Sequence, residues 1–325
     1  MKLRVAVLYG GRSGEHEISV RSARAVLAAM DPEKYEPVEY FIDQKGKWSP
    51  RAIVPEPGAQ GDIDVVFPVL HGTFGEDGTV QGLLELADLP YVGAGVLGSA
   101  VAMDKEMMKR VCRERGLPVV DYVIVTRGQA DVAKICRQLA FPLFVKPANL
   151  GSSVGISKAH DAAELGAAIA MAAQYDRKVI VERGVEGREL ECAVLGNETP
   201  LASLPCEILP SREFYDYEDK YLLDQAETRV PADLAAEKTD ELRRLAVECY
   251  RAVECEGMGR VDFLLEAATG KLYINEINTI PGFTSISMYP KMWDHSGIGF
   301  SALIDQLIEL ALDRAKRKKA TKFTR

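Results

Sequence analysis

The sequence lacks a hydrophobic run long enough to cross a membrane. Its longest stretch without a charged residue, Leu89 to Met103, has 15 residues and contains three glycines, whereas a membrane-spanning helix needs roughly 20 mostly apolar residues. The N-terminal residues lead directly into a strand-like segment, without the pattern of a signal peptide. The composition of the 325 residues is that of a globular protein, 47% hydrophobic and 27% charged. We therefore predict a soluble, cytoplasmic protein and, from length alone, about two domains.

Cysteine pairs and a positive charge excess are also absent. The six cysteines are scattered and form no Cys-x-x-Cys pair, so we expect reduced thiols and no zinc site. The formal net charge is −8, which argues against nucleic acid as a partner. The basic residues at the C-terminal end are interpreted as a solvated helix end, where cations suit the helix dipole.

Hydrophobic periodicity predicts a mixed α/β chain. Strands at Leu3–Tyr9, Pro37–Ile42 and Asp62–Leu70 alternate with helices that start near Ser13 and lie at Thr79–Ala87 and Val96–Met103. This alternation favours a parallel α/β layer up to about residue 103. Further helices are expected at Asp104–Arg115, Asp131–Leu139, Asp161–Tyr175, Asp233–Glu254 and Phe300–Lys318, and further strands at Pro118–Val125, Pro142–Lys146, Lys178–Glu182, Arg188–Leu195 and Leu201–Leu209. Ser211–Pro231 has no convincing period, and a loop of that length is usually functional, often a lid.

Two glycine-rich loops follow predicted strands of the N-terminal part. Gly10-Gly11-Arg12-Ser13-Gly14 lies between a strand and a helix, where anions bind, but it lacks the Gly-x-Gly-x-x-Gly spacing of dinucleotide sites. The next residue, Glu15, either complements the helix dipole or holds an ammonium group. The loop 71–78 follows a strand end, where ligands of open α/β sheets gather. His71 is accordingly either a buried core histidine or a ligand-binding residue.

A third loop, Lys146 to Gly155, suggests phosphate binding. Its small residues would let backbone amides approach phosphate oxygens, and Ser152 and Ser153 add hydroxyl donors. Lys146, at the end of the preceding strand, adds a point charge. An ordinary serine–glycine turn is the alternative, because the Gly-x-x-x-x-Gly-Lys-Ser/Thr motif occurs nowhere in the chain.

The spacing within Arg260–Asn278 predicts a hairpin that carries a metal site. Pairing about a turn near residues 267–270 puts Asp262 beside Glu276 and Asn278, and the last two share a face because they are i and i+2. Three hard oxygen ligands suit magnesium bound to a nucleotide, and paired carboxylates repel each other without a cation. Polar residues on a solvated sheet face are the alternative. The following Pro281-Gly282 turn either ends the strand or aims a backbone N–H at a developing oxyanion.

These motifs, in order along the whole chain, resemble the D-alanine–D-alanine ligases of the ATP-grasp superfamily. The motifs are Gly-Gly-Arg-Ser-Gly-Glu-His-Glu at 10–17, His-Gly-x-x-Gly-Glu-Asp-Gly-x-x-Gln-Gly at 71–82, Asp-Lys at 104–105, Lys-Pro at 146–147, Gly-Ser-Ser-Val-Gly at 151–155, Glu-Gly-Arg-Glu at 186–189, Phe-Tyr-Asp-Tyr-x-x-Lys-Tyr at 214–221, Gly-Arg-Val-Asp-Phe at 259–263 and Asn-Glu-Ile-Asn-Thr-x-Pro-Gly-Phe-Thr at 275–284. Each motif alone is weak, but the ordered set is highly specific.

The resemblance implies a three-domain ATP-grasp fold of mixed α/β class with a parallel α/β N-terminal domain. Residues 1–103 would form the substrate-binding domain, and 104–187 and 188–325 would hold ATP between them, with a lid loop at 211–231. The implied reaction joins two D-alanines through D-alanyl phosphate, releases ADP and phosphate, and serves peptidoglycan precursor synthesis. It implies two Mg²⁺ ions, with Mn²⁺ as an alternative, and a cytoplasmic homodimer without nucleic acid or membrane partners.

The resemblance also assigns roles to individual residues. ATP would be bound by Lys105, Lys146, Ser152, Ser153, Glu182, Arg183, Val185, Glu189 and Lys220, and the metal ions by Asp262, Glu276 and Asn278. The two D-alanines would be held by Glu15, His71, Arg260 and Ser287. Catalysis would depend on Glu15, Ser152, Tyr221, Arg260 and Gly282, with Arg260 and the Gly282 amide at the tetrahedral oxyanion. Tyr221 in the lid implies that the second substrate is D-alanine rather than D-lactate.

Three other functions agree less well with the sequence. A non-catalytic nucleotide-binding protein on the same scaffold should have lost one of Lys146, Arg260, Asp262, Glu276 or Asn278, and all five are present. A ligase for another amino acid is disfavoured by the lid motif at 214–221 and the Glu15 loop. A divalent-metal hydrolase would not need the two phosphate-binding lysines.

Overall fold

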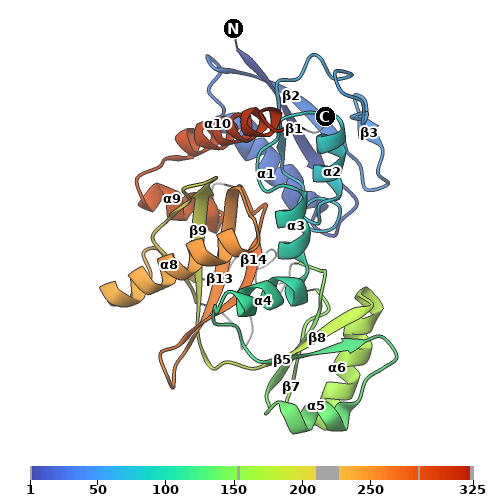
Figure 1. The fold of residues 1–325 in the computed structure, drawn as a ribbon, viewed down its shortest axis with the longest axis vertical. Helices are drawn as coiled ribbons and strands as arrows, with labels where there is room; N and C mark the ends of the chain where they lie inside the picture. Colours follow the sequence, from blue (N-terminus) through green and yellow to red (C-terminus); the bar gives the residue numbers. More distant parts are fainter. Residues whose placement is uncertain (1, 152–153, 210–226, 285, 323–325) are drawn as a thin grey trace.

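The structure, a computed structural model, describes residues 2–151, 154–209, 227–284 and 286–322, and it contains three β-sheets (Figure 1). The helices are α1 (His16–Ala29), α2 (Thr79–Leu86), α3 (Val96–Met103), α4 (Lys105–Glu114), α5 (Val132–Gln138), α6 (Ala162–Tyr175), α8 (Ala236–Ala252), α9 (Met288–His295) and α10 (Phe300–Lys319). The strands are β1 (Leu3–Gly10), β2 (Tyr35–Ile42), β3 (Trp48–Ser49), β4 (Val65–Pro68), β5 (Tyr122–Thr126), β6 (Leu143–Pro147), β7 (Ser157–Ala159), β8 (Lys178–Arg183), β9 (Gly187–Gly196), β10 (Leu201–Ala202), β11 (Cys206–Leu209), β12 (Glu227–Arg229), β13 (Gly257–Glu266) and β14 (Leu272–Asn278). The predicted mixed α/β class is confirmed.

The first sheet has the strand order β3-β2-β1-β4, and β1 pairs in parallel with β2 and β4. Val5 and Val7 of β1 pack into one core, while Ala6 and Leu8 pack into another on the opposite face, because alternate residues of a strand point to opposite sides. Burial on both faces is typical of a parallel sheet covered by helices. The parallel layer predicted for the N-terminal part is therefore confirmed.

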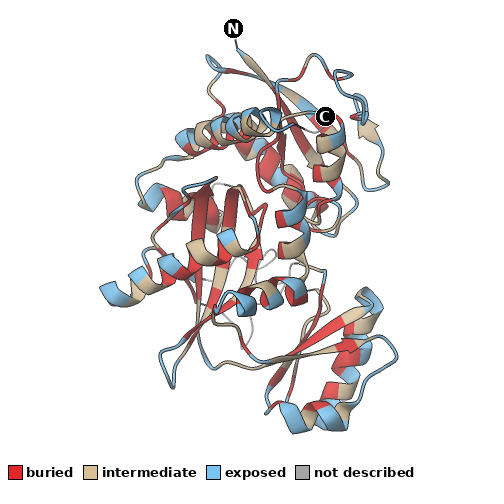
Figure 2. Cartoon of the chain, viewed as in Figure 1, coloured by how far each residue is buried: buried red, intermediate tan, exposed pale blue. Residues whose placement is uncertain are grey.

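The second and third sheets are antiparallel. The second has the order β5-β8-β6-β7 and forms a core of its own with α5 and α6. The third has the order β12-β11-β9-β13-β14, with β10 attached to β9, and packs one face against α4 and α8. In Figure 1 the third sheet lies between the first and the second. Buried residues are concentrated in the strands and on the inner faces of the helices (Figure 2).

The last helix returns to the first sheet. Leu303, Leu307 and Ile308 of α10 are fully buried in the core that also holds Val5 and Phe67 of the first sheet. The C-terminus accordingly lies beside the first sheet (Figure 1). The same core includes residues of β9 and α9, so the first and third sheets share one apolar interior, whereas the core of the second sheet is separate.

The start of α1 differs from the prediction. The helix begins at His16 rather than near Ser13, because Ser13 is held in a loop: its hydroxyl donates to the backbone oxygen of His71 at 2.7 Å and accepts from the backbone N–H of Glu15 at 3.0 Å. Glu15 therefore occupies the N-cap position, not the first turn. Its side chain makes no capping hydrogen bond. A carboxylate at the N-cap still lies near the positive end of the helix dipole, so this interpretation of Glu15 stays a prediction.

The segment Leu201–Leu209, predicted as one strand, is divided into β10 and β11. Between them, the Ser203 hydroxyl accepts from the backbone N–H of Ala193 at 3.1 Å and so takes the place of a strand partner. Pro205 adds a second interruption because it has no N–H to donate. Both strands still pair with β9, antiparallel as predicted.

Four short elements were not predicted: β3, β7, β12 and α9. α9 contains Pro290 in its first turn, a position where proline is tolerated because the first N–H groups of a helix have no partner within the helix. β12 lies within the loop predicted for Ser211–Pro231 and pairs with β11 at the sheet edge, where no hydrophobic alternation is needed. Residues 210–226 of that loop lie outside the described part of the chain.

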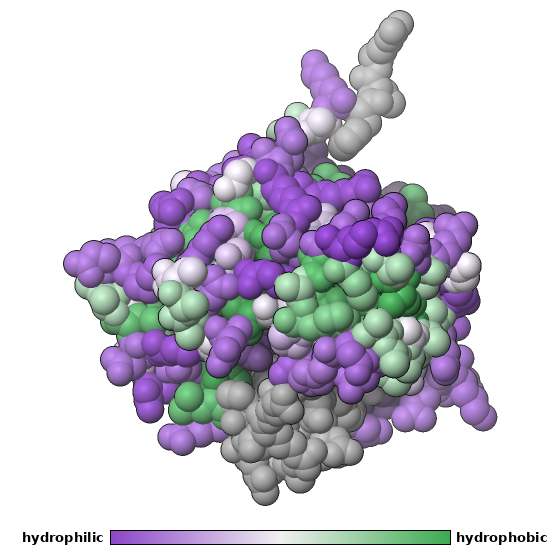
Figure 3. All heavy atoms as spheres, turned by 90° about the horizontal axis from the view of Figure 1, so that it is seen from below, coloured by the Kyte–Doolittle hydropathy of each residue, from purple (hydrophilic) through white to green (hydrophobic). Residues whose placement is uncertain are grey.

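The surface is mainly hydrophilic where it can be seen. Viewed from below, hydrophilic side chains surround smaller areas of hydrophobic ones (Figure 3). No helix of residues 2–151, 154–209, 227–284 or 286–322 is both long and apolar enough to cross a membrane.

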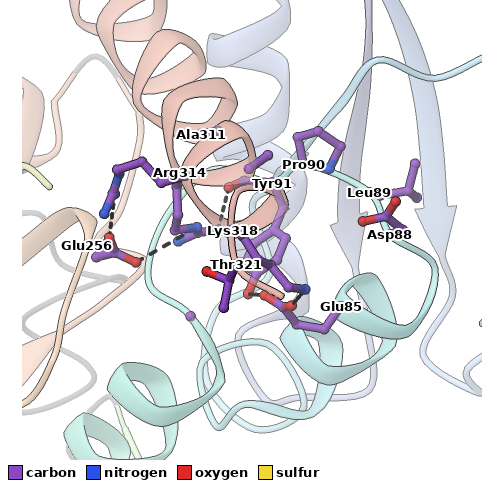
Figure 4. Close-up of a pocket in the computed structure, with 13 residues that line it drawn as sticks. Glu85, Asp88, Leu89, Pro90, Tyr91, Glu256, Ala311, Arg314, Lys318 and Thr321 are labelled. Carbon is purple, nitrogen blue, oxygen red and sulfur yellow. Dashed lines mark hydrogen bonds and ion pairs between the residues drawn. The ribbon is translucent and has the colours of Figure 1, made fainter. Parts of the chain in front are cut away.

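A cavity of about 340 Å³ lies where α10 meets the end of α2 (Figure 4). Arg314 covers the ring of Tyr91, with its guanidinium carbon 4.2 Å from the ring centre, and donates to the Tyr91 backbone oxygen at 2.7 Å. Lys318 pairs with Glu85 across the same cavity. These contacts tie the last helix to the first sheet, and none of the predicted site residues lines the cavity.

The packing of α10 generates the first prediction. Leu307→Ala should destabilise the protein by about 2–5 kcal/mol, because it removes a fully buried side chain and leaves a cavity. The shift in Tm measured by circular dichroism checks this. Glu309→Ala, an exposed position on the same helix, is the control and should change stability by no more than about 0.5 kcal/mol. Equal melting of both variants and the parent would contradict the assigned packing.

Candidate functional site

The three glycine-rich loops identified separately in the sequence meet around Glu15. A Cβ atom built on Gly72 would lie 2.9 Å from Glu15 Oε1, and one built on Gly151 would lie 3.0 Å from the same oxygen. The first two loops follow the carboxyl ends of the neighbouring parallel strands β1 and β4, which explains their proximity. Only a residue without a side chain leaves this space around the Glu15 carboxylate. Its role toward an ammonium group stays a prediction.

His71 uses both ring nitrogens inside the protein. Nδ1 lies 2.9 Å from the backbone oxygen of Ile280 and Nε2 lies 3.1 Å from Ser22 Oγ. Burial lowers the pKa of His71, although the nearby Glu15 charge opposes the shift. Because Nδ1 faces a carbonyl oxygen, it carries the proton, and Nε2 accepts from the serine hydroxyl. The imidazole thus holds residues 280–283, and the predicted contact with substrate stays a prediction.

Glu76 holds the same segment from a second side. Its Oε2 accepts from the Gly72 backbone N–H at 2.7 Å and its Oε1 from the Ile280 backbone N–H at 2.9 Å. Burial, and then the charge of Glu15, raise the pKa of Glu76 to about 8, while the two amides lower it. No role was predicted for Glu76, although it belongs to the 71–82 motif. Its position as a carboxylate inside a glycine-rich loop could have indicated a functional role.

The segment held by His71 and Glu76 carries Gly282. Ser22 Oγ accepts from the backbone N–H of Phe283 at 3.2 Å, which fixes the other side of the glycine. Within the described ranges, the Gly282 N–H has no hydrogen-bond acceptor. A Cβ on Gly282 would lie 2.9 Å from Ser287 Oγ, which itself lies 2.7 Å from Thr284 Oγ1. The glycine therefore presents a rigid amide donor, which is what the predicted oxyanion role requires.

The register of the third sheet gathers the predicted metal ligands on one face. Asp262 pairs with Glu276 of β14 on one side and with Glu191 of β9 on the other. Paired residues of neighbouring strands share a face, so these three carboxylates form a row. Asn278, two residues beyond Glu276, donates to Asp262 Oδ2 at 3.1 Å. The predicted neighbourhood of Asp262 is confirmed, and Glu191 is an addition that the Glu189-x-Glu191 alternation could have indicated.

A β-bulge departs from the predicted hairpin. Asp262 pairs with Glu276, but Phe263 pairs with Ile274, so Asn275 is an extra residue that the predicted hairpin did not include. Without the bulge, Ile274 and Glu276 would point to the same face, since they are i and i+2. The bulge lets Ile274 stay in the apolar core while Glu276 faces the carboxylate row.

Each carboxylate of the row contacts a cation. Arg260 donates to both oxygens of Asp262 at 2.7 Å and pairs with Glu191 at 3.2 Å. Although burial opposes it, the surrounding carboxylates, Asp262 foremost, hold the pKa of Arg260 well above its usual value. Lys105 Nζ lies 3.4 Å from Glu276 Oε2. These cations offset the repulsion that adjacent carboxylates would otherwise exert.

The row fits a magnesium ion that shares its coordination with a bound phosphate. No three histidine, cysteine or acidic side chains in the described ranges converge closely enough to hold a metal ion alone. Asp262, Glu276 and Asn278 supply hard oxygen donors, and Mg²⁺ usually takes one or two carboxylates and completes its shell with phosphate and water. The residue types present are therefore the ones such an ion needs.

Lys146 and Lys109 hold Glu182 between them. Lys146 Nζ lies 2.6 Å from Glu182 Oε2 and Lys109 Nζ lies 2.9 Å from Oε1. Although burial raises it, the charges of the two lysines bring the pKa of Glu182 down to about 2. Glu182 therefore stays ionised despite being 2% exposed. Lys109 was not predicted from the sequence. Its position four residues after Lys105 places both lysines on one helix face and could have indicated a shared site.

The remaining residues predicted to bind ATP lie on or near β8 and β9, or outside the described part of the chain. Arg183 pairs with Glu266 at 2.8 Å and is directed toward β13, Val185 follows β8 and is half-buried, and Glu189 lies on the same face of β9 as Glu191. Ser152, Ser153, Lys220 and Tyr221 lie outside the described residues.

Comparison with known proteins matches two family models. "D-ala D-ala ligase N-terminus" matches residues 4–57 and 50–94, and "D-ala D-ala ligase C-terminus" matches residues 111–309. A D-alanine–D-alanine ligase of Solibacter usitatus is 78% identical over 325 residues, 100% of each chain. The solved D-alanine–D-alanine ligase from Coxiella burnetii has a TM-score of 0.87 and 40% identity, covering 98% of this chain and 96% of that one. The Bacillus anthracis ligase complexed with ATP has a TM-score of 0.82 and 30% identity, covering 97% and 99%.

Glu76 gives a pH prediction. Its pKa is raised from 4.5 to about 8, so the stability that it contributes in the protonated form is lost as pH rises through that interval. Glu76→Gln cannot ionise. Hence the Tm of the variant minus that of the parent should increase between about pH 5 and about pH 9. Thermal melts across this range check it, with Glu309→Gln as the exposed control. A pH-independent difference would refute the assignment.

Proposed function

The chain belongs to the D-alanine–D-alanine ligase family, and from this premise we propose how its residues carry out the reaction. Its fold is the ATP-grasp fold, and it is an ADP-forming ligase that joins two D-alanines for the synthesis of cell-wall precursors. The observation that carries this conclusion is the 78% identity with a D-alanine–D-alanine ligase along the whole chain. ATP is one of its substrates, in keeping with the ATP complex of the Bacillus anthracis relative.

The reaction has two steps. A carboxylate oxygen of the first D-alanine attacks the γ-phosphorus of ATP, the bond to the bridging oxygen breaks, and ADP leaves. The amine of the second D-alanine then attacks the acyl carbon of D-alanyl phosphate, loses its proton, and the carbon–oxygen bond to phosphate breaks. In phosphoryl transfer the protein contributes mainly positioning and charge neutralisation, so the positions of this chain's charged groups determine how it can catalyse the reaction.

We propose that the ATP phosphates bind against Lys105 and Lys146, with Lys220, Ser152 and Ser153 adding donors. Lys105 and Lys146 are 6% and 8% exposed, and they contact Glu276 and Glu182 respectively. A phosphate oxygen can replace a carboxylate oxygen as the partner of an ammonium group. Glu182, Arg183, Val185 and Glu189 are proposed to bind the nucleoside, because they lie along β8, β9 and the connection between these strands.

Asp262, Glu276 and Asn278 are proposed to hold two Mg²⁺ ions, with Mn²⁺ as an alternative. When bound, Mg²⁺ supplies positive charge to the phosphate oxygens. The support is the oxygen-rich row of the third sheet, in which Asp262 pairs directly with Glu276. Arg260 pairs with Asp262 and Glu191 in the structure, which shows that these carboxylates attract a cation at this face of the sheet.

The D-alanine end of the site is proposed to lie at the loops around Glu15. Glu15 would receive the ammonium group of the first D-alanine, Arg260 and the Gly282 N–H would stabilise the tetrahedral oxyanion, and Ser287 would bind the second carboxylate. The support is the acceptor-free amide of Gly282 within the described residues and its contact with Ser287. His71 would lie beside the first D-alanine. Tyr221 and Ser152 would join Glu15 when the lid loop closes.

We further propose a division into domains at residues 103/104 and 187/188, a homodimer and a cytoplasmic location. The three sheets support a division into three units, and α4 connects the second unit to the third, because Met108 and Cys112 pack into the core of the third sheet. The net charge of −8 supports the absence of nucleic acid partners, and no membrane partner is proposed.

Phosphate release tests the function directly. The purified protein with ATP and Mg²⁺ should release phosphate and form the dipeptide with D-alanine, and should not do so with L-alanine. With D-lactate offered as second substrate at neutral pH, dipeptide should still be the main product because of Tyr221. A coupled phosphate assay with product analysis by mass spectrometry measures both. Phosphate release that does not depend on D-alanine would overturn the function.

The metal proposal has its own test. Glu276→Ala should abolish turnover because it removes a magnesium ligand, even at saturating Mg²⁺. Glu248→Ala, at a partly exposed glutamate of α8 that pairs with Arg244, should retain the parent rate. The comparison uses the same phosphate assay over a magnesium titration. A Glu276→Ala variant with near-parental turnover would eliminate Glu276 as a ligand.

A further inference from the structure

Lys109 is a fully buried cation to which the reaction described above gives no task. It lies on α4, four residues after Lys105, and its exposure is 0%. Burial lowers the pKa of Lys109, and the Glu182 charge opposes that shift. A buried ammonium group is costly unless it is paired and hydrogen-bonded. The cost of burying Lys109 must therefore be offset by its contacts or by a role in function.

The contacts of Lys109 reach two other elements. Its Nζ lies 2.9 Å from Glu182 Oε1 on β8 and donates to the backbone oxygen of Asn275 on β14 at 2.9 Å. Glu182 belongs to the second sheet, and Asn275 is the bulged residue of the third. One ammonium group thus connects α4 to both sheets that flank the proposed nucleotide site.

Lys146 contacts the same two residues through their other atoms. Its Nζ lies 2.6 Å from Glu182 Oε2 and donates to Asn275 Oδ1 at 3.2 Å. Lys109, Glu182, Lys146 and Asn275 therefore form a closed ring, in which each oxygen of Glu182 faces a different lysine. The two lysines are not equivalent, because Lys146 keeps 8% exposure whereas Lys109 keeps none.

This ring matters when a phosphate group binds. If Lys146 turns toward a phosphate oxygen, Glu182 loses one of its two cations. With Lys109 in place, the carboxylate remains paired. Without Lys109, the same movement would leave a buried carboxylate without a cation, which costs far more than a lost surface contact. The carbonyl contact of Lys109 also supports the bulge at Asn275, which directs Glu276 toward Asp262.

We propose that Lys109 is a positioning residue of the ligase: it holds Glu182 and the Asn275 bulge in place so that Lys146 is free to bind phosphate. The inference rests on the proposed nucleotide site. Lys109 touches no substrate in this assignment and acts through Lys146, Glu182 and Glu276. It follows that losing Lys109 should weaken nucleotide binding, since Lys146 then stays with Glu182, and should leave D-alanine binding unchanged.

The test is Lys109→Met, which keeps the length of the side chain and removes its charge. The Kd of ADP with Mg²⁺ is measured by isothermal titration calorimetry. Both this Kd and the KM of ATP should rise at least about tenfold, which is the loss of affinity expected when one hydrogen bond to a charged group is lost. The KM of D-alanine should stay within about twofold of the parent. Arg110→Met is the matched control, because Arg110 lies on the same helix, is largely exposed and pairs only with Glu106 in the described structure. Its nucleotide affinity should equal that of the parent.

A second variant distinguishes this role from simple structural support. In Lys109→Met combined with Glu182→Gln, the carboxylate that retains Lys146 is gone. Both oxygens of that carboxylate face lysines, so the nucleoside contact proposed for Glu182 is made by its backbone and is kept in the variant. ADP should therefore bind more tightly than to Lys109→Met alone. The double variant also removes the uncompensated buried charge, so it keeps the test available where the single variant fails to fold. No gain in ADP affinity in the double variant would overturn the proposal. A lower Tm and kcat with unchanged KM for ATP would overturn it as well.

The outcome also separates this inference from the proposed function. If the parent protein binds ADP and Lys109→Met binds it equally well, the positioning role is wrong and the nucleotide site stands. If the parent itself binds no ADP in the presence of Mg²⁺, the nucleotide site fails, and the inference fails with it.

Discussion

A charge that leaves water needs a partner of opposite sign close by, and the region where the second and third sheets meet is organised around this requirement. Its buried or half-buried charged residues include Lys105, Lys109, Lys146, Arg260, Glu182, Glu191, Asp262 and Glu276. Each of them contacts at least one group of the opposite sign. The partners come from different elements, so the positions of α4, β6, β8, β9, β13 and β14 are mutually dependent. A polyanionic ligand can enter such a network only by taking over existing contacts, which is what the proposed binding of phosphate at Lys105 and Lys146 requires.

The same requirement explains how the second sheet is attached. Its hydrophobic core contains residues of β5 to β8, α5 and α6 and is separate from the core that the first and third sheets share. Polar contacts connect it to its surroundings, among them Lys178 with Asp104 at 2.6 Å and Arg183 with Glu266 at 2.8 Å. Polar interfaces of this kind between parts of a chain permit relative motion more readily than apolar ones. The phosphate contact proposed for Lys146 would therefore bear directly on how this sheet is held.

The fold class, and the pairing of Asp262 with Glu276, could be predicted because both depend on local periodicity in the sequence. The bulge at Asn275 could not, since its contacts come from Lys109 and Lys146, far away in the chain. Burial of Lys109 was equally unpredictable, because a helical lysine is ordinarily exposed and only a partner from another strand makes its burial tolerable. Helix α9 was missed because its eight residues, with Pro290 in the first turn, are too few to show a clear helical period. The roles proposed around Glu15 came from the ordered motifs. The hydrogen bonds of His71, Glu76 and Ser22 that hold residues 280–283 could not be read from any motif.

The return of α10 to the first sheet has a consequence for synthesis on the ribosome. Leu303, Leu307 and Ile308 complete the core that begins with Val5 on the first strand, so the two halves of that core are separated by nearly the whole chain. The first strands emerge early but keep one apolar face incompletely covered until the last helix has left the exit tunnel. Contacts between such distant segments slow folding, and exposed apolar surface invites aggregation meanwhile. A chain without α10 would leave the core around Val5 open, and its apolar surface would be exposed to the chaperones that bind such surfaces.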